Sequence, residues 1–176
     1  MTIYVTRHGQ TAWNEQNMVC GATDIALSSA GKRQAEELAL KIKDKPIDLV
    51  FSSPLVRAAE TAEILCRSLQ LKAVPDCRLA EQNYGIFEGA KRDDPGFLKA
   101  RGQFAHRFPK GESTLQLAQR VYSFLDELGR EYSGKNILLV CHNYTARVIR
   151  SYFVDMDNEE FFSYRLEHCA FEEYTV

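Results

Sequence analysis

The segment TIYVTRHGQTAWN, Thr2 to Asn14, begins with β-branched and aromatic residues and then changes to small and polar ones. The first part predicts a strand, and Gly9 predicts a turn directly after it. An arginine and a histidine, Arg7 and His8, therefore stand side by side where a strand ends. Alone, the pair indicates a polar turn; completed by distant residues, it indicates a place where a phosphoryl group is held.

Further along the chain, short apolar runs alternate with stretches of helical periodicity. Strands are predicted at 2–6, 48–53, 72–79 and 136–142, helices at 27–43, 53–69, 113–132 and 144–153, and one or two closing strands within 161–176. The run 136–142 is apolar throughout, which is typical of a strand buried on both faces. The alternation predicts an α/β three-layer sandwich with a mostly parallel central sheet and helices on both faces.

Serines and prolines mark where several of these elements begin or end. Ser28 or Ser29 is expected to cap the helix 27–43, and Ser113 the helix 113–132. Ser53 is expected to cap the helix that follows the second strand, with the next residue, a proline, at its first position. A further proline within 72–79 restricts the third strand to a sheet edge or a strand end.

Residues 83–111 depart from this pattern, because prolines and glycines interrupt them and their charges show no periodicity. We expect a lid-like insertion there, with a short helix around 97–106. The chain of 176 residues suits one domain, 1–176, with a sizeable core.

Composition narrows the class of protein. The net charge of −2 gives no reason to expect nucleic acid or an anionic membrane as a partner. No apolar run approaches the roughly 20 residues that span a bilayer, and the start lacks the pattern of a signal peptide. Five cysteines without Cys-x-x-Cys spacing favour a reducing, cytoplasmic location.

Polar residues follow three of the predicted strands. His8 closes the first strand, Arg57 lies in the first helical turn after the second, and His142 closes the buried strand. Glu81 comes just after the third strand. Ligands of such sheets bind at the carboxyl ends of the strands, so these residues and Arg7 are expected to meet at one edge.

This set of residue types suits phosphoryl transfer. A neutral imidazole is a competent nucleophile, and flanking guanidiniums disfavour its protonation while binding phosphoryl oxygens in planar forks. Gly9 would allow a phosphate to approach the backbone. Positioning and positive charge supply what the reaction needs, so neither a metal nor another cofactor is expected.

Five blocks, RHGQTAWN, SSPLVRAAETA, EQNYGIFEG, FPKGES and LLVCHN, resemble the histidine phosphatase superfamily, also called the phosphoglycerate-mutase-like family, in order and spacing. The resemblance implies that His8 is phosphorylated, that Arg7, Arg57 and His142 surround the transferred group, and that Glu81 donates the proton. Further expected phosphate or substrate contacts are Asn14, Thr23, Tyr84 and Asn143. Asn143 stands where relatives usually have glycine, and His168 where they often have asparagine.

Several alternatives remain open at this point. Glu88 competes with Glu81 as proton donor, and the proton-donor role requires a raised pKa. Only 61 positions separate Glu81 from His142 (142 − 81), with no Arg-Arg pair between them, which favours a phosphatase of small phosphomonoesters. The other candidates are a phosphoglycerate-mutase-type transferase and a non-catalytic phosphate-binding relative. Homo-oligomerisation is possible through the aromatic tail.

The positively charged side chains of the insertion have two interpretations: they line the substrate pocket, or they form a solvated surface. These cations are Lys91, Arg92, Lys99, Arg101, Arg107 and Lys110. Four aromatic residues there either shape an apolar wall or anchor the insertion to the core: Tyr84, Phe87, Phe97 and Phe104.

Overall fold

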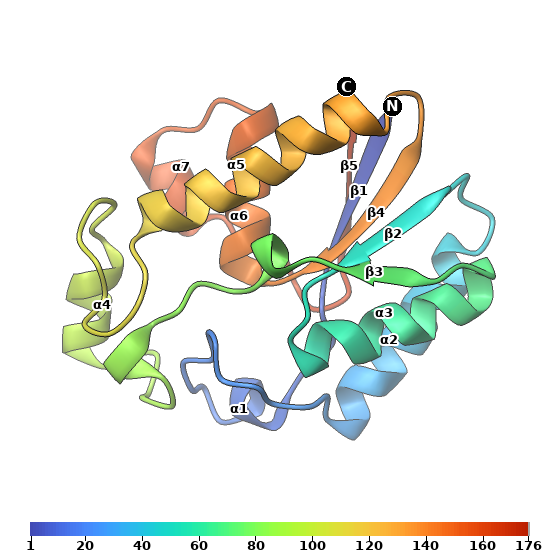
Figure 1. Ribbon diagram of the computed structural model, residues 1–176. Coiled ribbons are helices and arrows are strands. Elements are labelled where there is room, and N and C mark those ends of the chain that lie inside the picture. Colours follow the sequence, from blue (N-terminus) through green and yellow to red (C-terminus); the bar gives the residue numbers. More distant parts are fainter. Residues whose placement is uncertain (176) are drawn as a thin grey trace.

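The computed structural model describes residues 1–175, and a five-stranded sheet lies at its centre (Figure 1). The strands are β1 Thr2–Arg7, β2 Leu49–Ser52, β3 Ala73–Pro75, β4 Asn136–Cys141 and β5 Phe171–Thr175. Their order is β3-β2-β4-β1-β5, which puts the apolar strand β4 in the middle. The first four run parallel, and β5 pairs antiparallel with β1. The predicted α/β class with a mostly parallel sheet is confirmed.

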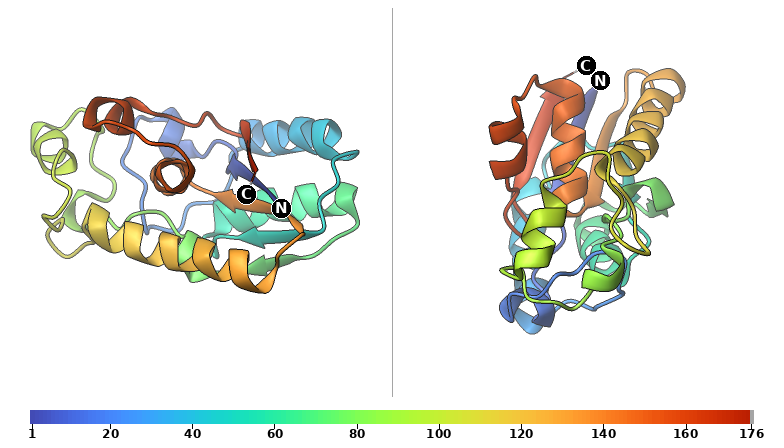
Figure 2. Two further views of the ribbon diagram at one scale, coloured as in Figure 1. Left: turned by 90° about the horizontal axis from the view of Figure 1, so that it is seen from above. Right: turned by 90° about the vertical axis from the view of Figure 1, so that its left-hand side faces the viewer.

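Helices cover both faces of this sheet (Figure 2). One layer contains α2 Ser29–Ile42 and α3 Val56–Leu69, and the other contains α5 Thr114–Glu131 and α6 Asn143–Phe153. Leu138 and Val140 of β4 pack with the first layer, whereas Ile137 and Leu139 pack with the second. Full burial of such side chains contributes about 1.5–3 kcal/mol each, so β4 stabilises both cores.

The helix caps agree with the sequence at two of three sites. Ser28 and Ser113 accept hydrogen bonds from the first turns of α2 and α5. The expected cap at Ser53 is wrong: α3 begins at Val56, whose N–H donates to the Asp24 carboxylate at 2.6 Å. Ser53 Oγ lies instead 2.7 Å from the imidazole of His142. A side chain distant in sequence thus caps α3, which leaves the serine for the site.

The third and last strands are shorter than predicted. β3 ends at Pro75 on the sheet edge, as the proline required. The predicted remainder forms a 3-10 helix, Cys77–Leu79, because the Asp76 carboxylate accepts the Arg78 N–H at 2.8 Å. The tail forms a short helix, α7 Asn158–Ser163, before the single closing strand β5.

The insertion 83–111 contains a 3-10 helix, Gly85–Phe87, and the short helix α4 Pro95–Arg101, slightly earlier than expected. A small cluster of buried side chains holds it to the loop near α1 Ala12–Glu15: Val19, Tyr84, Phe97 and Phe108. Figure 1 shows α1 and α4 on the side toward which the parallel strands run. Among residues 1–175, no helix combines the length and apolar character needed to cross a bilayer.

Candidate active site

His8 follows directly on β1 and is held by its neighbours on both sides. Its N–H donates to the Cys141 carbonyl of β4, and its own carbonyl lies 3.0 Å from Nδ1 of His168. Its ring centroid is 5.0 Å from that of His142 and 5.5 Å from that of His168. The predicted meeting of His8 and His142 at the carboxyl edge of the sheet is therefore found.

The hydrogen bonds of His8 determine which ring nitrogen carries the lone pair. Nδ1 lies 2.6 Å from the Gly9 carbonyl oxygen, which can only accept, so Nδ1 carries the proton and Nε2 is free to attack. Burial, followed by the positive charges of Arg57, His142 and Arg7, lowers the pKa of His8 well below its usual value. The imidazole is neutral at physiological pH, as a nucleophile must be.

Arg7 and Arg57 are 2% and 0% exposed, and neither forms an ion pair with a carboxylate of the described chain. Arg7 donates to the Leu166 carbonyl, and Arg57 to the carbonyls of Gly21 and Thr23. The Nε of each has no hydrogen-bond partner. Burial, with the charge of Arg92 next, lowers the pKa of Arg7 to about 10. Buried cations without counter-ions are suited to an anionic ligand.

His142 offers a third unpartnered nitrogen close to His8. Its Nε2 lies 2.7 Å from Ser53 Oγ, and this oxygen already accepts the N–H of Leu55. The serine hydroxyl can donate to Nε2, and in that tautomer the imidazole proton lies on Nδ1. Nδ1 is buried and has no partner. Together with the Nε atoms of Arg7 and Arg57, it provides three buried donors around the nucleophile, which suits the three equatorial oxygens of a phosphoryl group.

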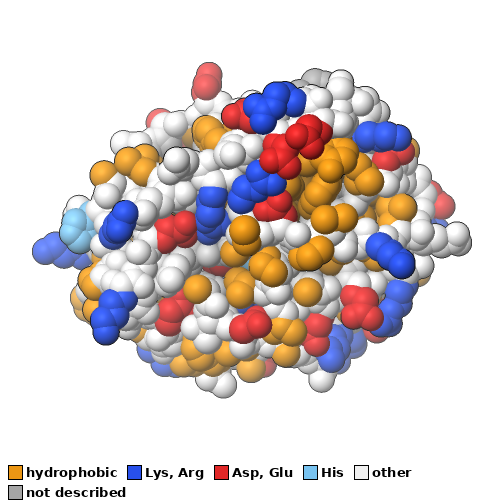
Figure 3. All heavy atoms as spheres, viewed as in Figure 1, with side chains coloured by type: hydrophobic (Ala, Val, Ile, Leu, Met, Phe, Trp, Pro, Cys, Tyr) orange, Lys and Arg blue, Asp and Glu red, His pale blue; other side chains and the backbone are white. Residues whose placement is uncertain are grey.

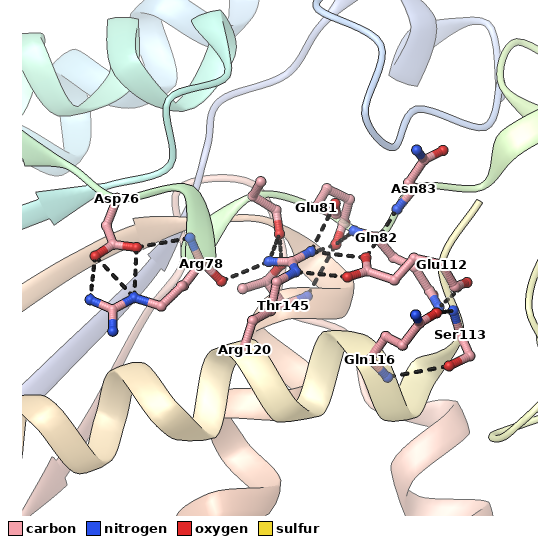
Figure 4. Close-up of polar contacts among 11 residues, drawn as sticks. Asp76, Arg78, Glu81, Gln82, Asn83, Glu112, Ser113, Gln116, Arg120 and Thr145 are labelled. Atoms are coloured by element: carbon pink, nitrogen blue, oxygen red, sulfur yellow. Dashed lines mark hydrogen bonds and ion pairs between the residues drawn. The ribbon is translucent and has the colours of Figure 1, made fainter. Parts of the chain in front are cut away.

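Glu81 lies at the N-terminus of α6. Its Oε1 accepts from the N–H and hydroxyl of Thr145, and its Oε2 accepts from the N–H of Tyr144 at 3.1 Å. Arg120 of α5 fixes the backbone around it by donating to three carbonyls, Glu81 among them, while pairing with Glu112 at 2.8 Å (Figure 4). Glu81 as a whole is 6% exposed, and it lines the same pocket as His8.

Glu88, the competing proton donor, lies elsewhere. Its carboxylate accepts five hydrogen bonds, from the N–H groups of Gly21, Ala22, Thr23 and Tyr84 and from the Thr23 hydroxyl. It does not line the pocket of His8. Because the carbonyls of Gly21 and Thr23 hold Arg57, Glu88 organises the loop that positions this arginine. Its role is structural, and the geometry favours Glu81 as the acid.

The pocket containing His8 has a volume of about 230 Å³. Of the predicted residues, six line it: Arg7, His8, Asn14, Glu81, Tyr84 and Asn143. Arg57 and His142 are completely buried and lie beneath the residues that line the pocket. Asn143 Oδ1 accepts the N–H of Leu166, so this asparagine anchors the tail segment.

Gly9 and Thr23 were expected at the phosphate and lie outside the pocket lining. A Cβ on Gly9 would lie 2.3 Å from the Gly31 carbonyl oxygen, and the Gly9 N–H already donates to Thr61. The absent side chain therefore allows the turn after β1 to approach α2 closely. The Thr23 hydroxyl is bound to Glu88, so this residue contributes only its carbonyl, to Arg57.

Two of the six cations named in the insertion, Arg92 and Arg101, line the pocket, whereas the other four do not. Tyr84 and Phe97 form part of its wall, while Phe87 packs in the insertion and Phe104 against the tail. Lining residues that the sequence did not indicate are Asn17, Val19, Cys20, Tyr144, Arg147, Ser163, Tyr164 and Arg165. Arg147 was detectable, because it lies four residues after Asn143 and hence on the same helix face. The tail residues carried no such signal.

Charge is distributed unevenly between the surface and the pocket. Both signs are interspersed over the face in Figure 3. The pocket lining contains five arginines and one carboxylate, Glu81. Across residues 1–175, no group of three or more histidine, cysteine, aspartate or glutamate side chains is arranged to hold a metal ion. The arrangement is thus an arginine-rich pocket that contains a neutral imidazole and one carboxylate side chain.

Comparison with known proteins agrees with this arrangement. The Shigella flexneri α-ribazole phosphatase structure has a TM-score of 0.86 at 26% identity and covers 98% of this chain and 89% of that one. A mycobacterial glucosyl-3-phosphoglycerate phosphatase complexed with VO3 has a TM-score of 0.87 at 25% identity, covering 98% and 91%. The "Probable phosphoglycerate mutase GpmB" of Yersinia pestis (strain Pestoides F) is 30% identical over 97% of this chain and 82% of that protein.

The family model for these proteins covers residues 3–176, almost the whole chain. The sequence blocks, the mostly parallel sheet and the buried His8–Arg7–Arg57–His142 cluster lead to the same assignment. The chain belongs to the histidine phosphatase superfamily (branch 1).

Proposed function

We propose that the protein is a phosphatase that hydrolyses small phosphomonoesters through a phosphohistidine formed on His8, without a metal cofactor. The observation that supports the proposal is the state of His8: Nδ1 is hydrogen-bonded to the Gly9 carbonyl, and the unprotonated Nε2 lies near arginines that form no ion pair with a carboxylate. Guanidiniums then supply the charge stabilisation that phosphoryl transfer requires.

In the first step, His8 Nε2 forms a bond to phosphorus while the ester P–O bond breaks. Glu81 donates a proton to the leaving alkoxide. In the second step, Glu81 accepts a proton from water, the water oxygen bonds to phosphorus, and the N–P bond breaks. Inorganic phosphate leaves, and both residues return to their starting states. Arg7, Arg57 and His142 Nδ1 bind the equatorial oxygens in both steps.

The comparisons support phosphomonoester chemistry more than any single substrate. Two of the similar structures are phosphatases by name, and one was solved with VO3, an oxyanion. The similar curated protein bears a mutase name. A mutase must keep water from the phosphohistidine, and between Glu81 and the start of α5 the chain contains only the 3-10 helix Gly85–Phe87 and the seven-residue helix α4. This short insertion favours hydrolysis.

The test is hydrolysis of p-nitrophenyl phosphate with EDTA present, comparing the wild type with His8→Asn and with His106→Asn as a matched control. We expect full activity in the wild type and in the control, which alters an exposed histidine, and a loss of about 10³-fold or more in His8→Asn. Intact mass after a substrate pulse should show one acid-labile phosphate on the wild type and on the control, and none on His8→Asn. Isomerisation of 3-phosphoglycerate faster than phosphate release would support the mutase instead, and phosphate binding without turnover would support the non-catalytic relative.

A further inference from the structure

A third buried arginine, Arg147 of α6, lines the pocket and is 1% exposed. Its Nε and Nη2 both donate to the Tyr164 carbonyl, at 3.2 and 2.7 Å, and the Tyr144 ring covers its guanidinium at 4.5 Å. Nη1 is buried and has no hydrogen-bond partner. The side chain is thus held on one edge and one face, with a donor left over for a ligand.

The charge of Arg147 is not compensated by the protein. Within residues 1–175 it forms no ion pair, and the same is true of Arg92 and Arg101 in the same pocket. Arg7 and Arg57 already match the two negative charges of a phosphoryl group. Glu81 offsets one further charge, so the pocket keeps a surplus of positive charge beyond what a phosphate monoester uses.

Among the described residues, no hydrogen bond or ring contact joins Arg147 to His8, Arg57 or Glu81. The charges that act most strongly on His8 are those of Arg57, His142, Arg7 and His168. Arg147 instead lies with the aromatic residues of α6 and the tail, where its guanidinium is also 5.5 Å from the Phe161 ring. A group bound to Arg147 would therefore belong to the substrate's alcohol portion rather than to its phosphoryl group.

Building on the proposed function, we infer that the substrate carries a second anionic group, a carboxylate or another phosphate, and that Arg147 Nη1 binds it. The pocket volume of about 230 Å³ is below the 300–1,000 Å³ of sites for drug-sized ligands, which limits the carbon skeleton to a few atoms. Arg101, which donates to the Phe162 carbonyl of the tail, adds positive charge at this end. Arg147 is a binding residue that sets specificity.

Two pairs of substrates test this inference, each pair differing only in the second anion. The first is 3-phosphoglycerate against glycerol 1-phosphate, and the second is propane-1,3-diol bisphosphate against its monophosphate. Phosphate release is measured for each. We expect the wild type to prefer the dianionic member of at least one pair by roughly 10- to 100-fold in kcat/KM, mostly through KM, as a hydrogen bond to a charged group predicts.

Arg147→Met is expected to abolish that preference by lowering kcat/KM for the dianionic substrate far more than for the monophosphate, and Arg147→Lys to retain part of it. Arg150→Met is the matched control: this arginine is also on α6, lies outside the pocket lining and pairs with Glu172. It should keep the wild-type preference.

Two results would overturn the inference: no preference in either pair for the wild type, or an equal loss for both members of a pair in Arg147→Met, as a purely structural role predicts. If Arg147→Met does not fold, the preference of the wild type within each substrate pair still tests the inference. Hydrolysis of p-nitrophenyl phosphate by the same preparation separates this failure from failure of the proposed function, since that ester has no second anionic group.

Discussion

Replacing Glu88 by glutamine should weaken the fold and the phosphoryl site together. Glutamine turns one carboxylate oxygen into an NH2 group that cannot accept. Fewer hydrogen bonds are lost if the NH2 group replaces Oε1, which accepts the N–H groups of Ala22 at 2.9 Å and Tyr84 at 3.0 Å, than if it replaces Oε2, which accepts three. Hydrogen bonds to charged groups contribute about 1.5–3 kcal/mol each, so two partly exposed ones lost together amount to about 3 kcal/mol.

For a domain of this length, that loss lowers the melting temperature by roughly 6–12 °C. Differential scanning calorimetry measures it, with Glu131→Gln, an exposed change at the end of α5, as the control. The same loop holds Arg57, so activity should also fall, and to the same extent for nitrophenyl and alkyl phosphates. Glu81→Gln should differ by reducing turnover of alkyl phosphates far more, because a poor leaving group needs the proton.

Two results would refute this division between the glutamates. A change in melting temperature of less than about 2 °C for Glu88→Gln would mean that its five hydrogen bonds do not anchor the loop. A dependence on the leaving group in Glu88→Gln, and none in Glu81→Gln, would exchange their roles.

Three other outcomes are expected. Gly9→Ala should destabilise the protein by about 1–3 kcal/mol in urea unfolding, because its Cβ would meet the Gly31 carbonyl oxygen at 2.3 Å; an unchanged midpoint would contradict this. Burial lowers the pKa of His168 to about 3, so below pH 6.5 the unfolded chain binds a proton that the folded protein does not, and the free energy of unfolding should fall by about 2 kcal/mol between pH 7 and pH 5 from this residue. His168→Asn should remove that part of the pH dependence and His106→Asn should not. Arg120→Met should lower kcat more than it raises KM, because the arginine fixes the backbone carbonyl of Glu81 and touches no pocket surface; a pure KM effect would argue against it.

The elements that could be predicted from the sequence are those set by local pattern. The apolar run of β4, the serine caps Ser28 and Ser113, and the order of strands and helices are all recorded in neighbouring residues. The meeting of His8 and His142 follows as well, since parallel strands bring their carboxyl ends to one edge.

Contacts between distant segments could not be predicted. Three examples are the cap of α3 by Asp24, the packing of Gly9 on Gly31, and the hydrogen bonds between Glu88 and the loop 21–23. Each depends on how segments far apart in the sequence pack together, and sequence periodicity does not encode this. The tail is the clearest case. The backbone carbonyls of Tyr164 and Leu166 accept hydrogen bonds from Arg147 and Arg7. Every residue has a backbone carbonyl, so the sequence does not indicate which ones accept these bonds.

The pairing of β5 with β1 has a practical consequence for protein engineering. Thr2 lies opposite Thr175, at the end of the sheet away from the carboxyl edge that holds His8. A linker of a few residues could therefore join Thr2 to Thr175, with new termini opened at the exposed turn around Gly134, where nothing lies within 4 Å of an added Cβ. Such a circular permutant, or a tandem fusion built at either end, would leave the entrance to the pocket unobstructed.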